Sequence, residues 1–114
     1  MTEKIKVAET LLEQMDKVIL KLRQNEDRAV TGVGDMLPNI VEIFRGLFHM
    51  ADQKDIDIEI PVDILIQQLE NFEQFYQQQD IVQLADTLEY EVQGSVRFYI
   101  EILKIWSKNR CGMR

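Results

Sequence analysis

The chain has 114 residues, a net charge of -7 from 20 acidic and 13 basic side chains, and 46% hydrophobic residues. A chain of this length buries one hydrophobic core, so we expect a single domain over residues 1–108 and a flexible tail over residues 109–114. The one cysteine, Cys111, excludes an internal disulfide. No apolar run approaches the roughly eighteen residues that a membrane-spanning helix needs. We therefore expect a cytoplasmic protein with no membrane contact.

The first predicted element runs from Thr2 to about Gln24. Its apolar residues recur at alternating spacings of three and four, which is typical of an amphipathic helix with one buried face. Asn25 is a residue type that commonly follows the last turn of a helix, so we expect the helix to end there. The apolar positions are Ile5, Ala8, Leu12, Met15, Ile19 and Leu22.

The second element has the widest apolar face of the chain and should be the most buried helix. Pro38 complicates its start, because proline removes a backbone hydrogen bond and collides with the carbonyl four residues earlier. One interpretation is a loop that runs to Asp35, which caps a helix after it. The other is a helix that begins near Asp27 and is kinked around Gly34. The uninterrupted spacing of the apolar residues favours the kinked helix. These apolar positions are Val30, Val33, Leu37, Ile40, Phe44, Leu47 and Ala51.

The segment from Asp52 to Ile60 alternates acidic residues with isoleucine, which is the period of a β-strand. The sequence has no second alternating segment that could pair with it. We therefore expect an extended connector whose isoleucines pack against the helices. A third helix should follow from Pro61, because proline suits the first turn of a helix.

Asp80 is a favourable cap for the last and longest helix, which should reach Trp106. The buried positions predicted for this helix are Ile81, Ala85, Leu88, Val92, Ser95, Tyr99, Ile102 and Trp106, with Leu84, Phe98 and Ile105 beside them. Four amphipathic helices joined by short links predict an all-α fold, an antiparallel four-helix bundle.

The segment Asp80 to Val92, DIVQLADTLEYEV, carries a resemblance to known sequences. It resembles a segment of small uncharacterised helical proteins of Gram-positive bacteria, in which an acidic connector precedes LADLLEYE. The similarity in helix spacing extends over residues 1 to about 106. Such proteins often have a proline shortly after the EYE, where this chain has Gly94. The resemblance implies a helical bundle and no assigned activity.

Residues that could carry chemistry are few and scattered. His49 is the only histidine, and no further histidine or nearby cysteine could complete a zinc site with it. Glu91 lies at the edge of the predicted apolar face, beside Tyr90. No phosphate-binding glycine loop or catalytic triad pattern is present, so we expect no catalytic residue, cofactor or metal. The alternative is a small enzyme or ligand-binding bundle that uses Glu91, Tyr90 or His49 in a polar pocket between helices.

The charges are unevenly distributed along the chain. Residues 52–91 contain 11 acids and one base, Lys54, whereas residues 92–114 contain one acid and five bases. The acidic block would repel a nucleic-acid backbone, so we expect no nucleic-acid binding. The pattern favours a non-catalytic interaction protein: an adaptor, an assembly factor or a chaperone-like protein.

The partner is expected to be a protein, with a second copy of the chain as one possibility. The last helix has more large apolar residues than a small bundle obviously needs, and surplus apolar surface is typical of an interface. The predicted interaction surface consists of Phe98, Ile102, Ile105 and Trp106, and self-association into a homodimer is expected from it.

Overall fold

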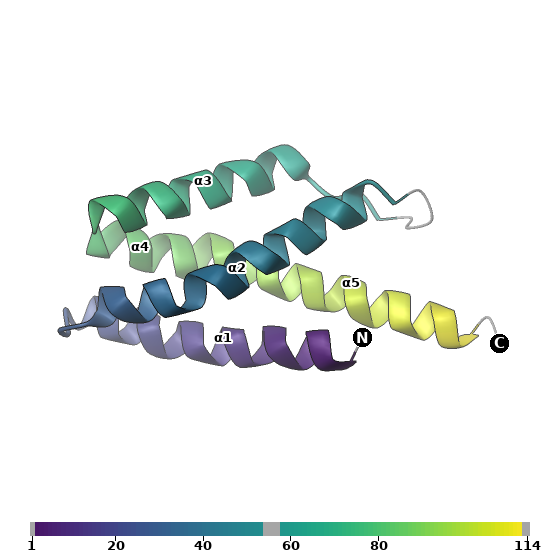
Figure 1. The fold of residues 1–114 in the computed structure, drawn as a ribbon, viewed down its shortest axis with the longest axis horizontal. Coiled ribbons are helices and arrows are strands. Elements are labelled where there is room, and N and C mark those ends of the chain that lie inside the picture. Colours follow the sequence, from purple (N-terminus) through teal and green to yellow (C-terminus); the bar gives the residue numbers. More distant parts are fainter. Residues whose placement is uncertain (1, 54–57, 113–114) are drawn as a thin grey trace.

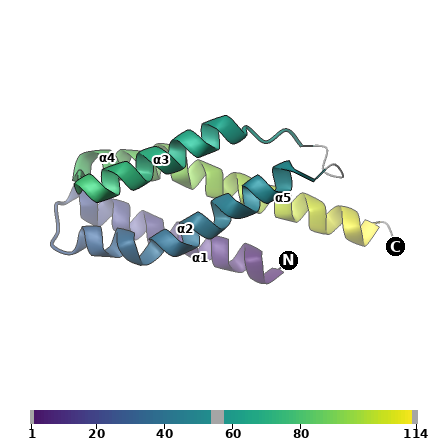
Figure 2. The same cartoon turned by 45° about the horizontal axis from the view of Figure 1, so that its top comes forward.

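The computed structural model describes residues 2–53 and 58–112, with side chains described as far as residue 107. Its elements are α1 (Thr2–Arg23), α2 (Ala29–Ala51), α3 (Val62–Gln78), α4 (Ile81–Thr87), η1 (Leu88–Val92) and α5 (Gln93–Gly112). The elements form four helical rods: α1, α2 and α3 are one rod each, and α4, η1 and α5 together form the fourth. Successive rods run in opposite directions (Figures 1 and 2). The predicted all-α, antiparallel four-helix bundle is confirmed.

The predicted helix ends agree with the structure at two positions. After α1, the backbone N–H of Asn25 donates to Leu22 and that of Glu26 donates to Lys21, while Asn25 takes a left-handed φ of 54°. These are the two hydrogen bonds of a Schellman motif, which satisfies carbonyls at a helix end. At the start of α4, the Asp80 side chain accepts from the backbone N–H of Gln83 at 3.2 Å. Asn25 and Asp80 therefore act as predicted.

The long interpretation of the second helix is confirmed. Helix α2 begins at Ala29, two residues after the predicted Asp27, and continues through Pro38. The alternative, a loop as far as Asp35, is wrong. Both views show that the axis of α2 changes direction along its length (Figures 1 and 2). Pro38, and the backbone hydrogen bond that it cannot form, explain this bend.

The connector between α2 and α3 behaves as predicted where it is described. Ile58 and Ile60 are partly buried and pack against the core. Ile56 lies outside the described residues. At the other end of the chain, α5 continues to Gly112, so the helix extends beyond residue 108, where we expected the domain to end. The side chains of the predicted tail lie outside the described residues.

The fourth rod differs from the prediction by its π-helical turn, η1. The buried residues of this rod occur as pairs of neighbours in the sequence. Before the π turn, these pairs are Leu84 with Ala85 and Thr87 with Leu88. The next buried pair, Val92 with Gln93, begins five residues after Thr87 rather than three or four. A π turn holds one more residue than an α turn and absorbs this extra step. After it, the buried pairs again recur every three or four residues: Ser95 with Val96, Tyr99 with Ile100, and Ile102 with Leu103.

Two glycines give opposite predictions for substitution by alanine. A Cβ on Gly46 of α2 would lie 2.9 Å from the Tyr99 ring, which is only 7% exposed, whereas a Cβ on Gly94 would meet nothing within 4 Å. We expect Gly94→Ala to raise the free energy of unfolding by about 0.5 to 1 kcal/mol, since alanine favours the helix. Gly46→Ala should lower it by about 1 kcal/mol, because the displaced ring outweighs that gain. Urea denaturation of both variants measures the difference, and equal shifts of the two midpoints would contradict it.

Candidate functional site

An apolar groove of about 370 Å³ opens between the start of α3 and the region where η1 passes into α5. We call it the α3–α5 groove. One wall carries Ile64, which is 58% exposed, and the other carries Tyr90, which is 72% exposed. Gly94 leaves the space between them unfilled. Exposed apolar side chains around a hollow are typical of a surface that binds a partner. The remaining apolar lining residues are Pro61, Leu65 and Phe98.

The π turn explains why this groove exists. Leu84, Glu91 and Phe98 are spaced by seven residues and would share one face of a regular helix. In the structure, Leu84 is buried, whereas Glu91 and Phe98 are only half-buried and line the groove. The extra residue in η1 turns this column away from the core, so an aromatic ring that a regular helix would bury becomes available at the surface.

Hydrogen bonds fix the two walls of the groove. Ser95 of α5 is buried and donates to the side-chain oxygen of Gln68 in α3. Gln93, also buried, donates to Asp16 of α1 at 2.6 Å. The buried polar residues among the described side chains all fall between residues 87 and 95. These two hydrogen bonds fix the rotation of the start of α5 about its own axis, relative to α1 and α3.

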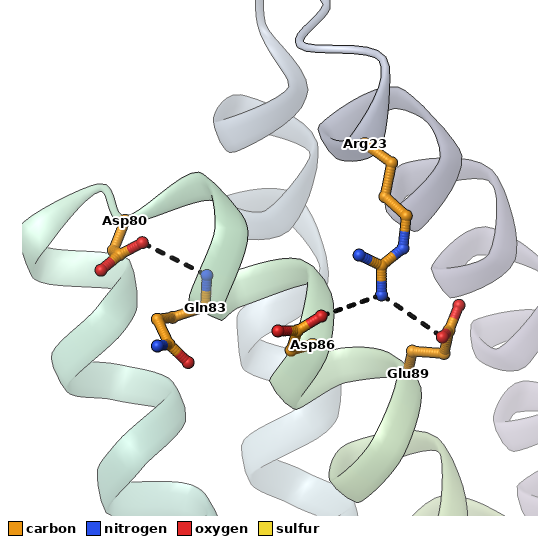
Figure 3. A network of polar contacts seen from close by, with 5 residues as sticks. All are labelled: Arg23, Asp80, Gln83, Asp86 and Glu89. Atoms are coloured by element: carbon orange, nitrogen blue, oxygen red, sulfur yellow. Dashed lines mark hydrogen bonds and ion pairs between the residues drawn. The ribbon is translucent and has the colours of Figure 1, made fainter.

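A network of charges lies at the end of α1, where Arg23 pairs with Asp86 and Glu89 (Figure 3). Tyr90 adjoins this network through Glu89. The guanidinium of Arg23 lies 3.1 Å from a carboxylate oxygen of Asp86 and 3.3 Å from one of Glu89. Hydrogen bonding to Asp86 raises the pKa of Arg23, and hydrogen bonding to Glu89 raises the pKa of Tyr90. These groups are exposed, so the ion pairs contribute little to stability. One guanidinium faces two carboxylates, so this cluster keeps a net negative charge. Glu59 and Glu91 are the acids that line the groove.

The four residues of the predicted interaction surface have different environments. Ile102 is buried in the core, so its place on a surface is a wrong prediction. Phe98 and Trp106 are partly buried and pack against the core, and Ile105 is exposed. Leu103 turns inward because the core face shifts by one residue at η1, whereas Ile102 continues the regular spacing of Leu88, Val92 and Ser95. The surplus of apolar surface from which we expected a homodimer is therefore smaller than the sequence suggests.

The residues of the enzymatic alternative do not converge. Tyr90 and Glu91 line the α3–α5 groove, whereas His49 lines a second groove, of about 490 Å³, between α1 and α2. The second groove has mixed charges at its edge: Arg45 lies 3.5 Å from Glu42, and both side chains are more than two-thirds exposed. His49 forms a 3.3 Å hydrogen bond with Gln53.

Tyr99 is the buried titratable residue of the second groove. Burial, with a further contribution from the charge of Glu42, raises the pKa of its hydroxyl. The phenol is therefore neutral at physiological pH and is not a ready base.

Residues 2–53 and 58–112 contain neither a metal-binding cluster nor a membrane-spanning helix. No group of three or more His, Cys, Asp or Glu side chains is arranged to hold a metal ion within these ranges. None of the helices in the same ranges combines the length and the apolarity that crossing a bilayer requires.

Comparison with known proteins gives a match to a protein family. A family model described as Domain of unknown function (DUF8042) matches residues 1–97. The match includes the segment Asp80 to Val92 and all the lining residues of the α3–α5 groove except Phe98. Searches of curated proteins and of solved structures found no match.

Proposed function

Since the chain belongs to the family described as Domain of unknown function (DUF8042), we propose a function from its own surface: a non-catalytic helical bundle that binds another protein through the α3–α5 groove. The observation that carries this proposal is the pair of exposed side chains, Ile64 and Tyr90, on either side of the space above Gly94. A cytoplasmic adaptor or assembly factor is the role that we propose for such a bundle.

The residue types in the groove support protein binding over catalysis. Tyrosine is enriched among the residues that dominate binding energy at protein interfaces, because it buries a large rigid ring and keeps one polar group. A space of about 370 Å³ holds a few side chains of a partner rather than a whole helix. We therefore propose that apolar side chains of a partner insert between Ile64 and Tyr90, above Gly94.

The groove can be closed without disturbing the core. Because Gly94 is exposed and has nothing within 4 Å of its would-be Cβ, Gly94→Phe should fill the groove and leave the fold intact. A second variant, Ile64→Ser/Tyr90→Ser, removes the exposed apolar side chains. The matched control is Leu20→Ser/Val82→Ser, since these residues are 57% and 67% exposed and lie outside the groove.

The test is affinity capture with mass spectrometry from the native cell, with each variant compared with the unaltered protein. We expect at least one protein that is captured by the unaltered chain and by the control, and is lost with both groove variants. Far-UV circular dichroism shows that each variant is folded. If every captured protein is retained by the groove variants, or lost equally with the control, the proposed function is wrong.

A further inference from the structure

The α3–α5 groove lies in the part of the chain that is richest in negative charge. Residues 58–91 contain eight acids and no lysine or arginine. Glu59 and Glu91 line the groove, and Asp63 is exposed in the first turn of α3, beside Ile64. Arg23 pairs with Asp86 and Glu89, so it does not offset the acids at the groove. A ligand that reaches Ile64 and Tyr90 must therefore come close to three carboxylates.

We infer that the groove binds a basic amphipathic helix of a different protein, one that inserts apolar side chains above Gly94 and sets lysine or arginine side chains against Glu59, Asp63 and Glu91. This inference rests on the proposed function and adds the chemistry of the partner. An amphipathic helix presents apolar side chains every three or four residues along one face, with charged residues at its borders. That arrangement matches an apolar hollow with acidic edges.

A second copy of this chain fits the groove less well. Two-fold pairing would place Glu59 and Glu91 of one copy against the same acids of the other, and such like charges repel. Head-to-tail pairing would use the basic end of α5, but Ile102 and Leu103 there are buried in their own core, and Trp106 packs against it. Only Ile105 of those apolar residues is exposed. The basic segment is thus expected from another protein.

The experiment uses a fluorescein-labelled 18-residue peptide, with leucine at every third or fourth position and lysine elsewhere, as the probe. One comparison peptide has glutamate in place of lysine. A second has the same leucines and lysines in an order without an apolar face. Binding is measured by fluorescence anisotropy with the full chain at about 50 mM and 300 mM salt, since exposed charges are screened over a few ångströms at the higher value.

The variants separate charge from apolar contact. Neutralisation at the groove, Glu59→Gln/Asp63→Asn/Glu91→Gln, should weaken binding of the lysine peptide about tenfold at the lower salt and less at the higher. The matched control neutralises exposed acids that do not line the groove: Glu13→Gln/Glu70→Gln/Glu73→Gln. Gly94→Phe should abolish binding at every salt concentration.

The outcomes distinguish this inference from the proposed function. Equal binding of the lysine and glutamate peptides, no binding of the lysine peptide, or equal losses in the two neutralised variants would each overturn the inference. The capture experiment then still decides whether the groove binds a protein at all. A mass above 13.4 kDa in sedimentation equilibrium that falls to 13.4 kDa with Gly94→Phe would also overturn the inference, because the occupant would be a second copy.

Discussion

Replacing Phe44 by alanine should lower the free energy of unfolding by about 3 to 5 kcal/mol, which is a large fraction of the stability of a small domain. Phe44 is fully buried at the middle of α2, with its ring edge-to-face against Phe48 at a centroid distance of 6.4 Å. The alanine would leave a cavity between helices that cannot close around it without bending. Urea denaturation, with the midpoint and the slope fitted separately, measures the loss.

Two further variants show whether this loss comes from the centre of the core. Leu37→Ala should cost less than Phe44→Ala, because Leu37 is only partly buried although it packs against the same cluster. Leu20→Ala, on the exposed face of α1, should change the free energy of unfolding by less than about 0.5 kcal/mol. A Phe44→Ala variant no less stable than Leu20→Ala would mean that α2 is not the central helix of the bundle.

Spacing alone could predict the helices because each buries one face against its neighbours. In α1 and α2 the apolar residues recur without interruption, and both helices are found within about two residues of their predicted bounds. Asn25 and Asp80 could also be predicted, since their roles depend on local hydrogen bonds of one residue type to the nearby backbone. These features are local, so the sequence suffices for them.

The π turn could not be predicted from the column of residues that we took as the core of the last helix. Leu88, Val92 and Ser95 keep the regular spacing across it and are buried on both sides. The one-residue shift of the core face is visible only in the columns of residues beside this one. Glu89 and Leu103 belong to one column of residues spaced by seven. Along this column, an acid at Glu89 gives way to a buried apolar residue at Leu103. This change from an acid to an apolar residue along one column was the available signal.

The candidate site was only partly accessible from the sequence. The sequence predicts Tyr90 and Glu91 as candidates for chemistry, and Phe98 as a candidate for an interface. Their joint position opposite Ile64 depends on how α3 and α5 are placed in space, which no spacing within one helix specifies. Ile102 lies on the column that keeps its regular spacing, so its predicted burial is confirmed and its assignment to the interaction surface is wrong.

Deleting Tyr90 should leave the bundle folded, with a free energy of unfolding within about 1 kcal/mol of the unaltered chain. A deletion within an α-helix rotates everything beyond it by about 100°. Here, the buried pairs on either side of η1 are already one residue further apart than an α-helix requires. Removal of one residue would turn η1 into an ordinary α turn and keep the pairs from Val92 to Leu103 facing the core.

Deleting Arg97 is the matched control, because this exposed residue lies in the regular helix α5. No extra residue is available there to absorb the change, so Tyr99 and Leu103 would be turned away from the core. We expect a loss of at least about 4 kcal/mol in the free energy of unfolding, since several large apolar side chains become exposed. Thermal unfolding followed by circular dichroism compares the two deletions. If both proteins unfold at the same temperature, η1 does not hold an extra residue.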